Sequence, residues 1–569
     1  MNKILIPFLL LLLGHSITAQ TYVRYNHVGY TPSRDKRVIV MSENDLGDQP
    51  WQLIDSLKQV VLSGKIGLSK AQKSAHTPLD FNYEIDLSSV KTIGNYTLIC
   101  AETKTPISIK THAYDFIPKD VLRYIRVHRS GTKECLDHKA SHKGDRSCKV
   151  MRSTGDNSVW EIDTATKKVN MKGGWYDAGD YIKFTLTSAY ACYLILRSYE
   201  AYPELFDYKV HSASELNDIL DEALHGLEYL SKTLPDPKTF IIQVGGHEDH
   251  NQGVRLPEFD ELNGFRECYA AHSPTQMGYT AAALALGAKI FKDIPEYQEH
   301  AKRYEEKAKA IYDQMINEEH IAWVQSGWET FYKDDSPYDN QALAAIELYN
   351  LTGERNYLTK AKELAHLAKS AYWVSWGSAH MIVHNRIYAK DKELFEYLET
   401  DLNTFEGISQ QHGNIWDVPH KYTWATLYSF LGVANGAMLF QESTKLKKRF
   451  NEIPLDVLDY SLGMNNWGIA MVASEKIPNS VENIYSQIYR LKPKLYPTGA
   501  IAEGPGDMAT HRSLKQYFQI DEDNPFDKFN TSAVVFYDDE TDFQTMETTI
   551  GGLADGLFFY TLIAKKYAK

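Results

Sequence analysis

The segment GGWYDAGDYIKF, residues 173–184, places two carboxylates three residues apart in a turn interrupted by glycine. On a turn, or on the first turn of a helix, this spacing can bring Asp177 and Asp180 to the same side. Two carboxylates held this way can bind a water molecule and remove its proton, which is general-base chemistry. A second interpretation fits the same letters: one Asp caps the helix expected over 187–199, and the other is solvated.

The segment also resembles, almost letter for letter, the DAGD signature of glycoside hydrolase family 9, inverting enzymes best known as endo-β-1,4-glucanases. The resemblance extends along the chain. YNHVGYTPSRDKRVIV (25–40) resembles the start of the family's N-terminal immunoglobulin-like domain, and VLRYIRVHRSG (121–131) its first barrel helix. QVGGHEDH (243–250) resembles QVGDG-x-x-DH, DYSLGMNNWG (459–468) resembles YxLGxNP, GAIAEGPG (499–506) resembles GGLVGGPN, and DFQTMETTIGGLADGLFFYTLIA (542–564) resembles the C-terminal YxxNE helix.

The resemblance implies three catalytic roles. Asp180 is the expected general base, Asp177 helps to position the nucleophilic water, and Glu547 is the expected general acid. Inversion requires one protonated and one ionised carboxyl, roughly 6.5–9.5 Å apart, on either side of the sugar. We expect partial burial and the preceding acidic residues to raise the pKa of Glu547; these residues are Asp538, Asp539, Glu540 and Asp542. The alternative for Glu547 is a carboxylate that only stabilises a helix N-terminus.

Aromatic side chains are the second expected component, because the apolar face of a pyranose ring stacks on Trp or Tyr. The candidates are Trp175, Tyr176, Trp376, Trp416, Trp424 and Tyr485, each of which could instead belong to the core. His250, in the DH pair, matches a family position near the sugar. Our predicted substrate-binding set is Trp175, Tyr176, His250, Trp416, Tyr485 and Arg490.

The sequence departs from the family pattern at several positions around the predicted site. Met546 stands where Asn usually precedes the acid, and NQGVRLP (251–257) replaces the Trp residues that follow the DH pair. PNSVENIYSQIYRLKPKLYPTG (478–499) lacks the expected His-His-Arg cluster; Arg490, or His511 with Arg512, could replace it, and surface charge is the alternative. These departures put the substrate in question more than the reaction.

Metal sites are a further expectation of the resemblance. The family's zinc site uses an RCG cysteine and a CH pair, but this chain has Ser130, and Ser141 with His142, so we expect no zinc there. A separate cluster could bind zinc or form a Cys135–Cys148 disulfide; its members are Cys135, His138, His142 and Cys148. The family often holds calcium near KDDSPYDNQALAAIELY (333–349), where Asp335, Asp339 and Asn340 are our tentative calcium ligands and a solvated acidic turn is the alternative. Catalysis itself requires no cofactor.

The surrounding elements fall into two groups. Seven short alternating runs between residues 21 and 114 predict an immunoglobulin-like β-sandwich. Long segments with apolar residues at i, i+3 and i+4 follow, and several, such as 276–291 and 423–440, are apolar nearly all round. Inner helices packed inside outer ones would explain this difference, so the sequence predicts an (α/α)6 barrel. An irregular stretch of about 80 residues, 464–546, is long enough to be functional.

Composition limits the remaining possibilities. The 569 residues are 43% hydrophobic and 24% charged with a net charge of −13, which excludes a disordered chain and argues against nucleic-acid or anionic-membrane partners. Residues 1–19 are typical of a signal peptide, and no later segment could span a bilayer, so we expect a secreted or periplasmic monomer. The predicted domains are 20–114 and 115–569.

The predicted function is inverting hydrolysis of β-1,4-linked glucan. One alternative is an exo-acting β-glucosidase, glucosaminidase or hemicellulase on the same scaffold. The other is a catalytically silent glycan-binding protein.

Overall fold

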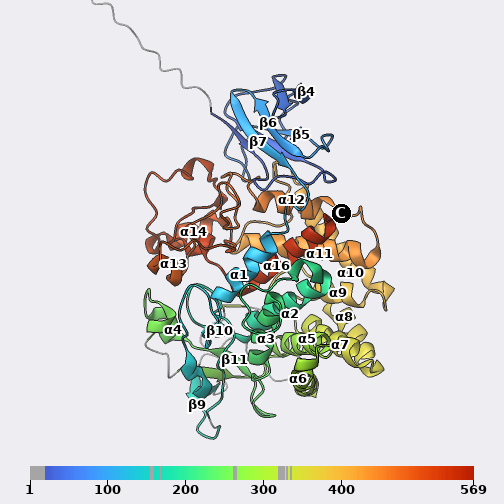
Figure 1. Ribbon diagram of the computed structural model, residues 1–569, viewed down its shortest axis with the longest axis vertical. Coiled ribbons are helices and arrows are strands. Elements are labelled where there is room, and N and C mark those ends of the chain that lie inside the picture. Colours follow the sequence, from blue (N-terminus) through green and yellow to red (C-terminus); the bar gives the residue numbers. More distant parts are fainter. Residues whose placement is uncertain are drawn as a thin grey trace, which may run out of the picture.

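The computed structural model describes residues 20–153, 159–166, 168–260, 266–317, 327, 331–332 and 336–568. An N-terminal β-domain sits on one end of a larger helical domain, as Figure 1 shows in blue and in green to red. The predicted signal peptide, residues 1–19, lies outside the described residues.

The N-terminal domain contains all seven predicted strands. One sheet has the order β1-β2-β5 and the other β4-β3-β6-β7. Along β6, Tyr96, Leu98 and Cys100 are buried while the residues between them are more exposed, which is the alternation expected of a strand with one face in the core. The strand bounds are β1 (Thr21–Arg24), β2 (Arg37–Ser42), β3 (Pro50–Ile54), β4 (Val60–Lys65), β5 (Phe81–Asp86), β6 (Gly94–Cys100) and β7 (Thr103–Ile109).

Six helices of the described residues form a closed inner ring, in which each packs against the next and the last returns to the first. They are α2 (Thr185–Ala201), α5 (Pro274–Phe291), α7 (Tyr338–Thr352), α9 (His380–Ile387), α11 (Thr426–Thr444) and α16 (Ile550–Lys566). One further helix precedes each of these six in sequence. These helices are α1 (Ile117–Val127), α3 (Asp218–Leu230), α6 (Gln298–Asn317), α8 (Arg355–Ala368), α10 (Phe395–Ser409) and α12 (Glu452–Ser461). The ring confirms the predicted (α/α)6 barrel.

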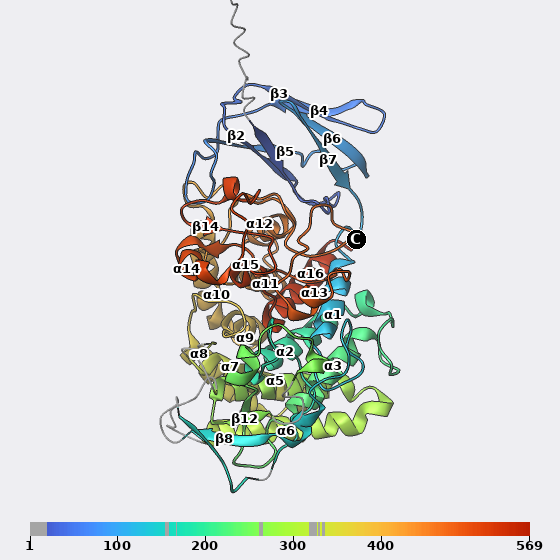
Figure 2. The ribbon, with the colours of Figure 1, turned by 90° about the vertical axis from the view of Figure 1, so that its left-hand side faces the viewer.

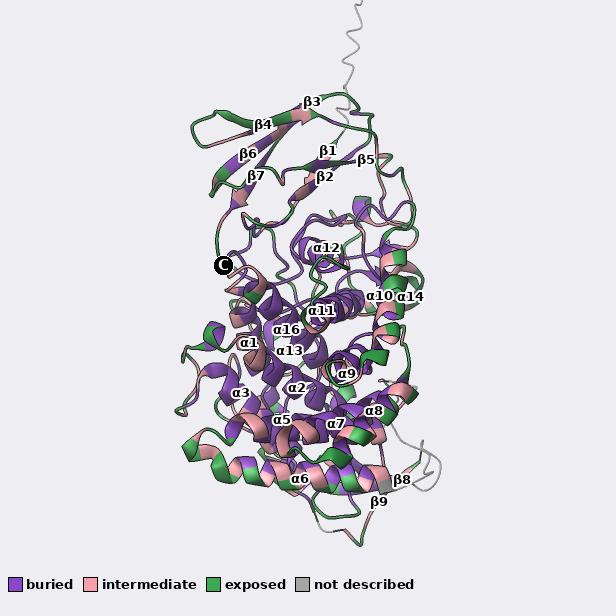
Figure 3. Ribbon diagram, turned by 90° about the vertical axis from the view of Figure 1, so that its right-hand side faces the viewer, coloured by how far each residue is buried: buried purple, intermediate pink, exposed green. Residues whose placement is uncertain are grey.

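Burial separates the two layers as the hydrophobic patterns predict. In Figure 3, α2, α5, α11 and α16 are buried almost throughout, whereas α6 alternates between buried and exposed residues. Helix α6 is amphipathic because its charged residues repeat on the side away from α5 and α7. An apolar circumference therefore identifies an inner helix of this barrel.

A five-stranded sheet within the helical domain was not predicted. Its order is β10-β11-β12-β8-β9, and its strands are β8 (Lys149–Ser153), β9 (Trp160–Ile162), β10 (Lys183–Phe184), β11 (Ile241–Val244) and β12 (Glu267–Ala270). These strands are too short and, in β11, too uniformly buried for a period of two to be visible. The pairing of Lys183 with Val244 joins the end of the 173–184 segment to the strand before α4 (His247–Asn251).

The irregular stretch 464–546 contains only short elements. They are α13 (Gln487–Leu491), β13 (Gly506–Asp507), α14 (Met508–Leu514), β14 (Val534–Val535) and α15 (Phe543–Met546), with two 3-10 turns. Figure 2 shows this part of the chain, in orange and red, between the β-domain and the green helices. Buried ion pairing fixes the two domains together: Arg34 pairs with Asp459, and their side chains are 1% and 2% exposed.

Candidate active site

The N-termini of several inner helices meet at one end of the ring. Asp177 and Asp180 precede α2, Glu547 precedes α16, and Tyr332 and Trp376 precede α7 and α9. The Tyr332 hydroxyl donates a hydrogen bond to Asp177 Oδ2, and its ring centroid lies 4.7 Å from that of Trp376. The partial positive charge of helix N-termini therefore faces the candidate carboxylates.

Backbone hydrogen bonds hold the 173–184 turn in place. The amide of Asp177 donates to the carbonyl of Ile182 at 2.9 Å, and the Asp177 carbonyl accepts from the amide of Ile550 at 2.7 Å. The second bond ties the turn directly to the first residue of α16. Neither Asp caps α2, because the N-cap residue is Phe184 and no side chain accepts a capping bond there. The capping interpretation is wrong, because capping of α2 occupies neither carboxylate.

Asp177 is 3% exposed, and both of its carboxylate oxygens are engaged. Oδ1 accepts from the Thr187 hydroxyl, and Oδ2 accepts from the Tyr332 hydroxyl. Burial raises the pKa of Asp177 to about 7, the neighbouring charge of Asp180 adds to this rise, and the two hydroxyl donors oppose it. Asp177 is thus fixed in orientation by two donors.

Asp180 is more accessible than Asp177. Its Oδ1 accepts from the amide of Ile182 at 3.0 Å, and its Oδ2 lies 2.8 Å from Nδ1 of His250. The Asp180 and His250 side chains are 18% and 48% exposed. Because β10 pairs with β11, the short helix that carries His250 is brought next to the turn. Of the two aspartates, Asp180 is the one that solvent can reach.

Glu547 lies between α15 and α16, and its backbone is extended. Its Oε1 accepts from the amide of Gly179 at 2.9 Å, which leaves Oε2 to carry a proton. Burial raises the pKa of Glu547 to about 8; the charges of Asp180 and Asp177 add to this rise, and the Gly179 hydrogen bond opposes it. The direction and the contribution of burial agree with our prediction, but the expected source of the charge was wrong, because the charges that raise this pKa are those of the two aspartates of the turn.

Comparison with known proteins agrees with this arrangement. The family model described as "Glycosyl hydrolase family 9" matches residues 114–558, and "Cellulase N-terminal ig-like domain" matches residues 18–105. The chain belongs to glycosyl hydrolase family 9.

Its relatives include several glucanases. Endoglucanase C of Cellulomonas fimi is 26% identical over 540 residues, which is 86% of this chain and 47% of that protein. The xyloglucan-specific endo-beta-1,4-glucanase BoGH9A of Bacteroides ovatus is 23% identical over 500 residues, 80% of this chain and 81% of that protein. The chain spans about half the length of Endoglucanase C and of two Bacillus endoglucanases.

The solved structure of a metagenome-derived glycoside hydrolase family 9 endoglucanase shares the fold. Its TM-score is 0.76 at 21% identity, and the alignment covers 96% of this chain and 99% of that chain. At this level of identity the likeness establishes the fold alone.

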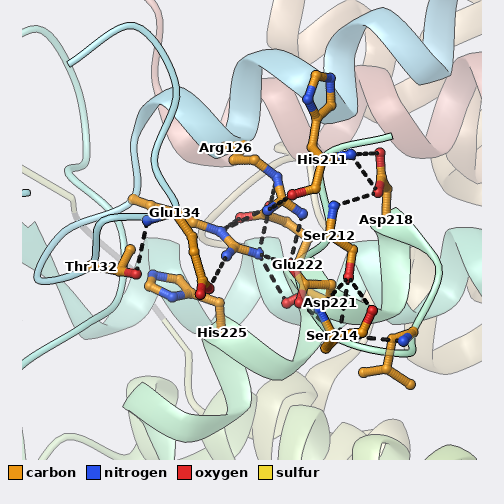
Figure 4. A network of polar contacts seen from close by, with 12 residues as sticks. Arg126, Thr132, Glu134, His211, Ser212, Ser214, Asp218, Asp221, Glu222 and His225 are labelled. Atoms are coloured by element: carbon orange, nitrogen blue, oxygen red, sulfur yellow. Dashed lines mark hydrogen bonds and ion pairs between the residues drawn. The ribbon is translucent and has the colours of Figure 1, made fainter. Parts of the chain in front are cut away.

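Trp175 does not bind substrate in this family 9 structure. Its side chain is 0% exposed, and its indole N–H donates to Glu222 Oε1 at 2.8 Å. Glu222 belongs to the buried network in Figure 4, in which Arg126 and Arg129 bind Asp221 and Glu222 on α3. Trp175 therefore holds the turn against the core of the barrel. The prediction was wrong because a GGW sequence does not reveal which face of the turn is buried.

Tyr176 and Trp416 are also core residues. The Tyr176 hydroxyl lies 2.5 Å from Ser141 Oγ and 2.7 Å from His142 Nδ1, and the residue is 2% exposed. Trp416 is 0% exposed and donates to the carbonyl of His76 and to Asn466, at the boundary with the N-terminal domain. Neither ring can stack on a sugar, so both substrate-binding predictions are wrong.

The remaining predicted binding residues lie nearer the carboxyl groups. Tyr485 pairs with Glu547 in a parallel bridge, and a Cβ on Gly179 would lie 2.8 Å from both the Tyr485 ring and Glu547 Oε1. Arg490 Nε lies 3.6 Å from Glu540. Burial raises the pKa of Tyr485 to about 12, and the charge of Arg490 opposes this rise. The side chains of His250 and Tyr485 are therefore beside the site, and Arg490 is on its margin.

Sequence reasoning missed two side chains of the site. Tyr332, which binds Asp177, lies in a segment with no motif of its own. Glu503, in GAIAEGPG, is 3% exposed, and its amide donates to the carbonyl of Glu547 at 3.1 Å. The sequence does contain a signal for Glu503, because it is an acidic residue in a segment whose other residues are small or apolar.

The predicted metal ligands are only partly described, because Asp335 lies outside the described residues. Asp339 Oδ2 accepts from the Ala379 amide at 2.6 Å and lies 2.9 Å from Nδ1 of His380. Asp339 Oδ1 and the Asn340 side-chain amide are buried without a partner among the described residues. These oxygens are hard ligands of the kind that calcium prefers.

The Cys and His cluster does not assemble. All five cysteines are free thiols, so there is no Cys135–Cys148 disulfide. The Cys135 thiol donates to the carbonyls of Thr132 and His138, and the Cys148 thiol to that of Asp145. Among the described residues, neither group with metal-ligand spacing contains a cysteine.

Proposed function

We propose that this chain is an inverting glycoside hydrolase that cleaves β-1,4-linked glucan-type chains. The observation that carries the proposal is the hydrogen bond from the Gly179 amide to Glu547 Oε1, which joins the acid to the turn that bears Asp177 and Asp180. The raised pKa of Glu547, about 8, keeps this carboxyl protonated at neutral pH. Inversion requires a protonated and an ionised carboxyl on either side of the scissile bond, and this hydrogen bond fixes one of them relative to the turn that bears the other.

The proposed step is a single displacement at the anomeric carbon. Asp180 accepts a proton from water while the water oxygen bonds to the anomeric carbon, and Asp177 helps to orient that water. The bond to the glycosidic oxygen breaks as Glu547 gives that oxygen its proton. His250, beside Asp180, fixes the base and can contact the sugar, as can Tyr485. No cofactor takes part.

The substrate assignment rests on the glucanases that the chain resembles. An endo-acting enzyme releases products of mixed length from cello-oligosaccharides, whereas an exo-acting glucosidase releases one sugar at a time. Proton NMR of the first product tests the mechanism, because inversion yields the α-anomer from a β-linkage. A β-anomer, or no hydrolysis of any β-linked glycan despite binding, would contradict the proposal.

The second part of the proposal is a structural calcium ion at Asp339 and Asn340. The unpartnered oxygens there support it, since buried polar atoms without partners are costly. The ion would brace the N-terminus of α7, close in sequence to Tyr332. Millimolar calcium should raise the melting temperature relative to EDTA, magnesium should not, and Asn340→Ala should abolish the difference. Equal melting temperatures in calcium and EDTA would remove this part of the proposal.

The third part of the proposal concerns where the protein acts. Among the helices of the described residues, none combines the length and apolar character that crossing a bilayer requires. The N-terminal sequence supports export to the periplasm or medium, where polymeric glycans are found. The mature chain acts as a monomer. Sizing of the purified protein and N-terminal sequencing of the exported form test both statements.

A further inference from the structure

Glu503 is fixed beside the proposed acid by its backbone. Its amide donates to the carbonyl of Glu547 at 3.1 Å, and the next amide, of Gly504, donates to the carbonyl of Thr545 at 3.1 Å. The carbonyl of Glu503 accepts from the amide of Leu427, in the first turn of α11, at 2.9 Å. The main chain thus holds Glu503 alongside Glu547.

The Glu503 carboxyl is buried but only partly satisfied. The residue is 3% exposed, and its Oε2 has no hydrogen-bonding partner among the described residues. Burial together with the charge of Glu547 raises the pKa of Glu503 well above its usual range, and the nearby Trp424 side chain opposes this rise. Trp424 itself is 39% exposed, so Glu503 lies just beneath a surface aromatic ring.

Several other buried carboxylates of this chain, though not all of them, are paired with Lys or Arg. Asp145 binds Arg266 and Lys183, and Glu347 binds Arg386. Within the described part of the chain, no Lys or Arg pairs with the four carboxyls of the site, which are Asp177, Asp180, Glu503 and Glu547. The basic side chain that does contact one of them there is His250, on Asp180. The site therefore carries an excess of acidic groups that no Lys or Arg of the described residues neutralises.

A neutral sugar would supply hydroxyl groups but no charge. A protonated amine supplies three donors and the missing positive charge, and it would allow a buried carboxyl to ionise. We propose that Glu503 is a specificity-determining residue that binds the ammonium group of a β-linked 2-amino-2-deoxy sugar, so that the enzyme prefers amino-glucan chains of the chitosan type. This inference rests on the proposed hydrolase function and refines its substrate.

The test compares three β-1,4-linked oligosaccharides of equal length, made of glucosamine, glucose and N-acetylglucosamine. We expect kcat/KM for the glucosamine oligomer to exceed that for the others at least about tenfold. Glu503→Gln should lower kcat/KM on the glucosamine oligomer by roughly 10- to 100-fold and change that on the glucose oligomer by less than about threefold. The matched control is Asp401→Asn on α10, another buried carboxyl with an unpartnered oxygen, which should leave the substrate ratio unchanged.

Any one of three results would overturn the inference. The wild type could have a higher kcat/KM on the glucose oligomer, or Glu503→Gln could lose kcat/KM equally on the glucose and glucosamine oligomers. The third result is that the wild type binds the N-acetylglucosamine and glucosamine oligomers equally. If Glu503→Gln does not fold, the comparison of free and acetylated oligomers by the wild type still decides. Calorimetric binding separates the two proposals. Tight glucosamine binding without hydrolysis would leave the recognition site standing and remove the hydrolase function.

Discussion

The backbone amide of Gly179 lies 2.9 Å from Oε1 of Glu547, although 368 residues separate them in sequence. This bond makes the turn that carries Asp177 and Asp180 a direct support of the opposite carboxyl. An N–H donor on Oε1 favours protonation on Oε2, so it orients the acid as well as holding it. Gly179 has no side chain, so its contribution can be tested by adding one.

Gly179→Ala should inactivate the enzyme without unfolding it. A Cβ at this position would lie 2.8 Å from Glu547 Oε1 and 2.8 Å from the Tyr485 ring, so the acid must move. Displacement of a catalytic group by about 1 Å can cost roughly 100-fold in rate, and we expect a loss in kcat of that size. Gly407→Ala, where the added methyl meets no atom within 4 Å, is the control. Wild-type turnover by Gly179→Ala would show that the contact is not needed.

Glu547→Gln should separate substrates by their leaving groups. Without a proton donor, hydrolysis of oligosaccharides should fall by at least about 100-fold, whereas aryl glycosides with acidic phenol leaving groups should lose far less. Asp180→Asn should abolish activity on both classes, because the water still needs a base. Equal losses on both classes in Glu547→Gln would assign the acid elsewhere.

Activity and stability should both depend on pH through Glu547. Activity should decline as pH rises past about 8, where Glu547 loses its proton. In the unfolded chain this group titrates near 4.5, so between the two pKa values the folded state binds the extra proton. The free energy of unfolding therefore falls as pH rises through that window.

The variant Glu547→Gln removes this dependence. Its melting temperature should match that of the wild type near pH 4 and exceed it near pH 8 by a few degrees. Asp177, whose pKa is raised to about 7, leaves a weaker slope of the same sign in the variant. Thermal unfolding followed at several pH values checks both statements, and parallel curves for the two proteins would contradict them.

Tyr332→Phe should lower kcat by roughly 10- to 100-fold with little change in KM. The hydroxyl is one of two donors to Asp177, and without it Oδ2 of a buried carboxyl loses its partner. The ring itself still packs on Trp376 and Phe184, at 4.7 and 5.3 Å between centroids, so the variant should fold. A larger effect on KM than on kcat would mean that Tyr332 mainly binds substrate.

The sequence allowed the architecture to be predicted better than the side-chain environment. Apolar circumference distinguished inner from outer helices, and the DAGD turn located two carboxyls, because both depend on local spacing. Trp175 and Trp416 show where this reasoning ends, since an aromatic residue near a motif can lie on either face of a turn. The charges that raise the pKa of Glu547 were also beyond reach, because the aspartates that act on it are distant in sequence.

The pairing of Arg34 with Asp459 predicts that the N-terminal domain stabilises the barrel. Both side chains are buried, and Asp459 also accepts from Asn26 Nδ2 at 2.8 Å. Arg34→Ala leaves a buried carboxylate without its cation, which should lower the free energy of unfolding by about 3–5 kcal/mol. Lys360→Ala, which breaks an exposed pair with Glu363 within the barrel, should cost less than about 1 kcal/mol. Denaturant unfolding of both variants measures the difference, and an equally small effect of the two would mean that the Arg34–Asp459 pair does not stabilise the contact between the domains.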